Sequence, residues 1–149
     1  MDYVNQIDLE SQTQFAAITV ALGDGRHFVA FRGTDGTLVG WKEDFNMACV
    51  CPIPSQIEGA SYVNKVANLI PHKLFIGGHS KGGNIAVYSA MSCENNIKPI
   101  IKTVYSHDGP GFREEVINSK EFQSIKNKIN KTIPYSSLVG ILLENHEHY

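Results

Sequence analysis

The chain has 149 residues, 42% of them hydrophobic, and fits a single globular domain over residues 1–149. Its net charge of −2, with no cluster of lysines and arginines among aromatic side chains, argues against nucleic acid as a partner. No run of about 18 apolar residues occurs, and the N-terminus lacks a basic region followed by an apolar one, which predicts a cytoplasmic protein without a transmembrane segment.

The first half of the chain predicts a β-hairpin followed by helices. Two β-branched and apolar segments, Gln14–Leu22 and His27–Phe31, flank a turn signal at residues 23–25, which is typical of two strands joined by a tight turn. Apolar residues then recur at helical spacing over residues 38–45 and again over residues 60–70.

Strands and helices alternate in the second half of the chain. The expected elements are a strand at 73–77, a helix at 84–91, a strand at 100–105, one or two amphipathic helices within 112–129, a short strand at 131–135, and a segment at 138–143 capped by Ser136. Such alternation builds a parallel sheet covered by helices, with the ligand site at the carboxyl ends of the strands. We therefore expect an α/β fold with a mostly parallel sheet.

One short motif carries the strongest chemical signal. Residues 78–82 read G-H-S-K-G, a G-x-S-x-G pattern placed directly between an expected strand and an expected helix. That context is required by a nucleophile elbow, a sharp strand-to-helix turn that presents a serine in a strained backbone conformation and needs small neighbours. The motif predicts Ser80 as a nucleophile, and the alternative is a glycine-rich turn in which Ser80 only caps the helix.

A serine hydroxyl is a weak nucleophile, so it needs a base and donors for the oxyanion that forms when it attacks a carbonyl. The backbone N–H of the residue after the nucleophile, here Lys81, is the expected first donor. A second donor comes from a loop after an earlier strand. Thr34 follows the strand that ends at Phe31, so its N–H and hydroxyl are candidates, the alternative being a turn hydroxyl that bonds its own loop.

The order of these motifs resembles a known family. F-R-G-T at residues 31–34, then Trp41 and Asp44, then G-H-S-K-G-G at residues 78–83 are similar to the succession found in class 3 lipases. The sequence D-G-P-G-F at residues 108–112 resembles a bacterial branch of uncharacterised lipase-like α/β hydrolases. The resemblance implies an α/β-hydrolase-type fold, of which this chain is a fragment truncated at both ends.

The resemblance also implies roles for single residues. It makes Thr34 an oxyanion-hole residue and Ser80 the nucleophile, with Trp41 and Asp44 as structural supports of the Thr34 loop. Lys81 departs from the family, which usually has an apolar residue there. We expect its charge to lie beside the site and to disfavour a triglyceride substrate.

The rest of a catalytic triad is less clearly marked. In α/β hydrolases the acid and then the histidine follow the serine along the chain. Asp108, just past the expected strand at 100–105, is our choice for the acid; an Asx-type turn is its structural alternative, and Glu144 is the competing carboxylate. His146 and His148 are the histidines that follow Asp108, and the base is one of these, an earlier histidine, or a residue beyond the chain end.

Two earlier histidines lie next to the motifs. His79 is a candidate to pack beneath the elbow, and His107 is a candidate to orient Asp108. The three cysteines, Cys49, Cys51 and Cys93, match neither a zinc-ligand spacing nor a disulfide framework, so we expect buried free thiols.

These observations favour a serine hydrolase that attacks a carboxylic ester or thioester through an acyl-enzyme at Ser80. The expected substrate is a small acyl ester or a lipid-like molecule, and no metal or organic cofactor is implied. The alternative function is a non-catalytic binding or regulatory module on a hydrolase scaffold. The sequence does not identify the acyl group, the leaving group or the oligomeric state.

Overall fold

The computed structural model describes residues 2–8, 13–34, 50–70 and 73–135, and these build one six-stranded sheet in chain order. The strands are β1 (Asp2–Asp8), β2 (Thr13–Gly23), β3 (Arg26–Phe31), β4 (Lys73–His79), β5 (Ile101–His107) and β6 (Ile129–Thr132). The pairs β1–β2 and β2–β3 are antiparallel, whereas β3–β4, β4–β5 and β5–β6 are parallel. The sheet is therefore mixed, with the parallel part at its C-terminal side.

The hairpin predicted from the sequence is confirmed. β2 pairs with β3 around a turn in which Asp24 and Gly25 have φ values of 47° and 76°. Two successive positive φ values are what the favoured two-residue hairpin turn requires. β1 was not expected, because its Asn5 and Gln6 hide the apolar pattern; it is an edge strand, and Tyr3 on it is 63% exposed.

The helices are α2 (Pro54–Leu69), α3 (Lys81–Ser92), α4 (Glu114–Ile117) and α5 (Lys120–Ile125), followed by the 3₁₀ turn η1 (Lys126–Lys128). α2 begins at Pro54, earlier than the predicted start at residue 60, because proline fits the first helical position, where its missing N–H costs nothing. β6 begins two residues before the predicted strand at 131–135. The expected elements at 38–45 and 138–143 lie outside the described residues.

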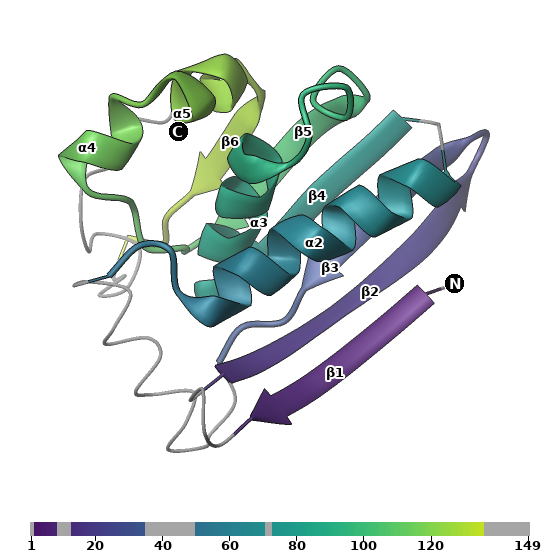
Figure 1. The fold of residues 1–149 in the computed structure, drawn as a ribbon, viewed down its shortest axis with the longest axis horizontal. Helices are drawn as coiled ribbons and strands as arrows, with labels where there is room; N and C mark the ends of the chain where they lie inside the picture. The colour runs from purple at the N-terminus through teal and green to yellow at the C-terminus, as the bar shows by residue number, and fades with distance from the viewer. Residues whose placement is uncertain (1, 9–12, 35–49, 71–72, 136–149) are drawn as a thin grey trace.

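α2 and α3 lie side by side across one face of the sheet (Figure 1). Alternate residues of the central strands point toward these helices and form the core, among them Val29, Phe31, Leu74 and Ile76, all at most 3% exposed. Because successive parallel strands are added in one direction by right-handed crossovers, their connecting helices gather on the same face. This arrangement places the start of α3 at the carboxyl edge of the sheet.

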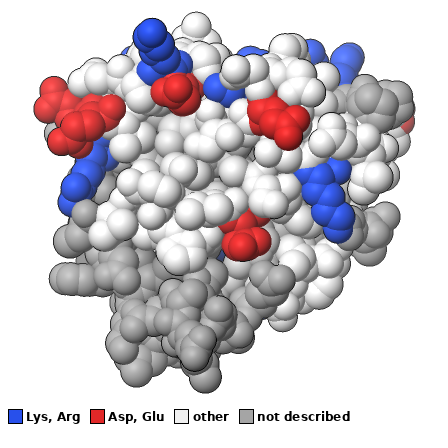
Figure 2. Space-filling model, in the orientation of Figure 1, with Lys and Arg blue, Asp and Glu red and all other residues white. Residues whose placement is uncertain are grey.

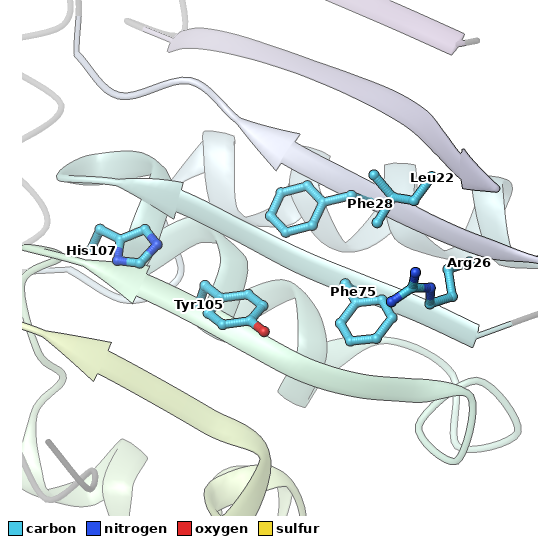
Figure 3. A pocket seen from close by; sticks show the side chains of 6 residues that line it. All are labelled: Leu22, Arg26, Phe28, Phe75, Tyr105 and His107. Atoms are coloured by element: carbon cyan, nitrogen blue, oxygen red, sulfur yellow. The ribbon is translucent and has the colours of Figure 1, made fainter. Parts of the chain in front are cut away.

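The opposite face of β3, β4 and β5 carries a hollow of about 380 Å³. It is lined by Leu22, Arg26, Phe28, Phe75, Tyr105 and His107, which Figure 3 shows in front of the strands with the helices behind. On the face seen in Figure 2, lysine, arginine and acidic side chains form small separate groups with uncharged surface between them. None of the described helices is long and apolar enough to cross a membrane.

Candidate active site

The turn between β4 and α3 has the geometry expected of a nucleophile elbow. Ser80 is the only residue between His79, the last of β4, and Lys81, the first of α3, and its φ and ψ are 54° and −128°. A positive φ strains a residue that has a Cβ. The Ser80 N–H donates to the His107 carbonyl at 2.8 Å, and the Ser80 carbonyl accepts from the Gly83 N–H at 2.9 Å, so the strain is held in place by β5 and by α3. Ser80 is half-buried.

Two glycines allow this turn to lie against its neighbours. A Cβ on Gly78 would lie 2.5 Å from the Gly82 carbonyl oxygen and 2.7 Å from that of Phe31. A Cβ on Gly82 would clash with the same Phe31 carbonyl. These contacts are with backbone atoms, which cannot move aside as a side chain can. The small residues of the motif are therefore required by the close approach of β3, β4 and α3.

The loop after β3 packs directly against the elbow. A Cβ on Gly33 would lie 2.8 Å from the His79 carbonyl oxygen and 3.6 Å from the Ser80 Cβ. Thr34, the next residue, is half-buried. The Arg32 N–H donates to the Ala16 carbonyl of β2 at 3.0 Å, which fixes the start of the loop. Residues 31–34 and residues 78–83, far apart in the sequence, thus meet at one edge of the sheet.

Asp108 lies at the neighbouring strand end. His79 and His107 are partners in the parallel β4–β5 pair, so Ser80 and Asp108 follow the ends of two adjacent strands. Asp108 also has a positive φ, 53°, and its N–H donates to the Thr132 carbonyl of β6 at 2.7 Å. It is half-buried. The structure thus brings Ser80, the Thr34 loop and Asp108 to the same edge.

A buried amide network, missed from the sequence, fixes the loop that carries Asp108. The Asn84 Nδ2 donates to the carbonyls of Pro110 and Gly111 at 3.0 and 3.1 Å. Its Oδ1 accepts from the Gln56 Nε2 at 2.7 Å, and the Gln56 Oε1 accepts from the Ile53 N–H at 2.9 Å. The first turn of α3 is therefore bonded both to the start of α2 and to the Asp108 loop. The available signal was a lone asparagine directly after G-H-S-K-G-G.

The expectation that Lys81 places a charge beside the site is wrong. The side chain is 1% exposed. Its Nζ donates to the backbone oxygen of Gln14 at 3.0 Å and to the Gln14 Oε1 at 3.1 Å, on β2. The ammonium therefore lies in the interior, and Lys81 can contribute only its backbone to the surface of the site.

The histidines beside the motifs do not take the roles considered for them from the sequence. His79 is exposed, so it does not pack beneath the elbow. His107 is also exposed; its Nδ1 lies 2.7 Å from the Thr132 Oγ1, and its ring stacks on Tyr105 with 6.0 Å between centroids. Residues 41, 44, 144, 146 and 148, which include the expected loop supports, the alternative acid and the candidate bases, lie outside the described residues.

The cysteines are distant from this chemistry. Cys93 is a buried free thiol, as predicted, and burial raises its pKa to about 11. Cys51 is free and half-buried rather than buried, and partial burial raises its pKa as well. Cys49 lies outside the described residues. Among the described residues, no three histidine, cysteine or acidic side chains are close enough together to hold a metal ion.

A family model described as Mbeg1-like matches residues 1–149. The chain belongs to the Mbeg1-like family. Among solved structures, it is similar to a fungal lipase determined in complex with an inhibitor, with a TM-score of 0.66 and 13% sequence identity. The match covers 93% of this chain and 58% of the lipase, so the chain spans little more than half of that protein. No curated protein matches.

The likeness to the fungal lipase supports an α/β-hydrolase-type fold for this Mbeg1-like chain, as the sequence predicted. At this level of identity the comparison concerns the fold alone. The scaffold is lipase-like, and the chemistry has to be argued from the residues at the carboxyl edge of the sheet.

Proposed function

We propose that this Mbeg1-like chain is a serine hydrolase that cleaves a carboxylic ester or thioester through an acyl-enzyme on Ser80. The observation that carries the proposal is the strained, half-buried Ser80 at the start of α3, with the Gly33–Thr34 loop packed against it. A positive φ at a serine costs about 1–3 kcal/mol, and such strain persists where the surrounding structure enforces it, often at active sites.

In the first step the Ser80 oxygen bonds to the substrate carbonyl carbon and its proton passes to a base, while the carbonyl π electrons move onto oxygen. The resulting oxyanion is bound by the N–H of Lys81 and by the N–H or hydroxyl of Thr34. The first amides of a helix have no acceptor within the helix and carry its positive dipole end, which suits a developing negative charge. Removal of one such donor costs about 10²–10³ in turnover.

In the second step the tetrahedral intermediate collapses. The oxyanion electrons re-form the carbonyl, the bond to the alcohol or thiol breaks, and the leaving group takes the proton from the base. Water then attacks the acyl-serine in the same manner and releases the acid. Asp108, beside Ser80 at the next strand end, is the group that orients the base. His146 and His148 are the candidates for that base, and replacing each by alanine tests which one it is.

The inward direction of Lys81 bears on the substrate. With its ammonium bonded to Gln14 in the interior, the residue after the nucleophile places no charge against an acyl group. The site is therefore compatible with an apolar acyl chain, and we propose a small acyl ester or a lipid-like ester as substrate. The lipase-like scaffold supports this choice.

Labelling with a fluorophosphonate probe tests the proposal, because the probe reacts only with a serine that is activated. We expect labelling of the wild-type chain and none in Ser80→Ala. Ser124→Ala is the matched control, since Ser124 is an exposed serine on α5 whose hydroxyl donates to the local Glu121 carbonyl and accepts from the Lys98 Nζ. Equal labelling in Ser80→Ala, or no labelling in any variant, would contradict a hydrolase and leave a binding or regulatory module.

A further inference from the structure

The proposed mechanism uses only the backbone of Lys81, yet its side chain is among the most completely buried in the described part of the protein. Burying an ammonium is costly by several kcal/mol unless hydrogen bonds compensate for the lost water. Here the Nζ bonds two oxygens of Gln14, at 3.0 and 3.1 Å, and Gln14 is itself only 2% exposed. The first residue of α3 is thus tied to β2, on the far side of β3.

The same stretch of β2 also holds the loop that carries the second proposed donor. Ala16, two residues after Gln14, accepts the N–H of Arg32 at 3.0 Å. Arg32 comes two residues before Thr34, and Gly33 between them packs against His79 and Ser80. Residues 14–16 therefore support both sides of the site: Lys81 through its side chain, and the Thr34 loop through its backbone.

We propose that Lys81 is a positioning residue, whose buried side chain sets the spacing between the two oxyanion donors by fixing both to residues 14–16. This inference rests on the proposed function of Ser80. Oxyanion donors act only within about 2.7–3.1 Å of the developing charge. A misplacement of about 1 Å can cost a hundredfold in rate, so a rigid common support for the two donors has a direct catalytic use.

A purely structural role for Lys81 makes a different prediction. If the side chain only contributes to folding, its loss lowers the free energy of unfolding without changing the turnover of the molecules that remain folded. If it positions donors that act in the transition state, its loss lowers kcat while KM for the ester stays the same. Because the effect passes through Gln14, the two residues are also expected to show non-additive effects.

The test compares Lys81→Met, Gln14→Leu and the double variant with wild type, using p-nitrophenyl butyrate as substrate at a temperature where each variant is folded. We expect kcat to fall about ten- to hundredfold in Lys81→Met with KM unchanged. The double variant should be no worse than Lys81→Met alone. Lys73→Met is the matched control, because Lys73 is an exposed lysine at the other end of the same strand, β4, and should leave kcat unchanged.

Hydrogen exchange of the peptides that contain residues 31–34 and 78–84 provides a readout that needs no activity. We expect faster exchange in both peptides of Lys81→Met and unchanged exchange in Lys73→Met. If Lys81→Met does not fold, Gln14→Leu, which keeps the backbone acceptor, is measured in its place.

The inference is overturned if kcat and both exchange rates in Lys81→Met, or in its Gln14→Leu replacement, equal those of Lys73→Met, or if the losses follow only the unfolded fraction. A wild-type chain without turnover refutes the hydrolase, and with it the catalytic use of the support. In that case the exchange data still decide whether Lys81 links the two segments.

Discussion

The turns after β4 and β5 use the same backbone conformation for different ends. Ser80 and Asp108 have φ values of 54° and 53°. Each donates its N–H to a carbonyl at the end of the next strand: Ser80 to His107 at 2.8 Å, and Asp108 to Thr132 at 2.7 Å. Both turns therefore lift a polar side chain at the carboxyl edge of the sheet by continuing the ladder for one residue past the strand.

The two turns lead into different structures. After Ser80 a helix begins at once, so the first amides of α3 lie in the turn that carries the serine. After Asp108 the chain passes through four buried residues, 109–112, and the next helix begins only at Glu114. The first turn combines a nucleophile with donors, whereas the second offers a carboxylate without a helix start. The chemistry of each turn is thus decided by the residues after it.

The largest effect is expected from Asp108→Asn. If Asp108 orients a base for Ser80, loss of its charge should lower kcat for an ester by about 10⁴, as for the acid of other triads. Steady-state hydrolysis of p-nitrophenyl butyrate measures this. Asp24→Asn, at another aspartate with a positive φ but in the β2–β3 hairpin, should have no effect. Unchanged turnover in Asp108→Asn would make the second turn purely structural.

Gly82→Ala and Gly109→Ala compare the tightness of the two turns. The Cβ at residue 82 meets the Phe31 carbonyl of the backbone, whereas the nearest atom for residue 109 is the Ser106 hydroxyl, which can rotate. We expect Gly82→Ala to lower the free energy of unfolding by about 3 kcal/mol and Gly109→Ala by less. Urea unfolding measures both. The reverse order would show that the second turn is the more closely packed one.

Asn84→Leu tests the link between the turns. The substitution leaves the carbonyls of Pro110 and Gly111 and the Gln56 amide without their present partner, which should cost about 2 kcal/mol of unfolding free energy. Ester turnover should fall as well, because the Asp108 loop is no longer held to α3. Asn130→Leu, at an exposed position on β6, is the control. A stable variant with full turnover would show that the network does not position the loop.

The smallest effect is expected from relieving the strain. Ser80→Gly and Asp108→Gly should each raise the free energy of unfolding, by about 1 kcal/mol or less, because glycine adopts a positive φ without a steric penalty. Ser124→Gly, in the middle of α5, should instead be destabilising. Thermal unfolding distinguishes these signs. A loss of stability in Ser80→Gly would mean that the serine hydroxyl contributes more to the fold than its strained backbone costs.

Local signals made much of this arrangement predictable. The hairpin was marked by Asp24-Gly25 between two apolar segments, and the elbow by G-H-S-K-G between a strand and a helix. β1 was missed because an edge strand needs few apolar residues. The direction of the Lys81 side chain could not be predicted, since its acceptors lie on Gln14, 67 positions away in the sequence. The same holds for Asn84, whose partners are brought to it only by the folded chain.

Trapping of the acyl-enzyme tests the central claim most directly. The chain is mixed with p-nitrophenyl butyrate, quenched in acid within the first turnover, digested and examined by mass spectrometry. The account predicts a butyryl group on the peptide that contains Ser80, absent from Ser80→Ala. Ester hydrolysis that continues in Ser80→Ala, or a butyryl group carried only by another residue, would contradict it.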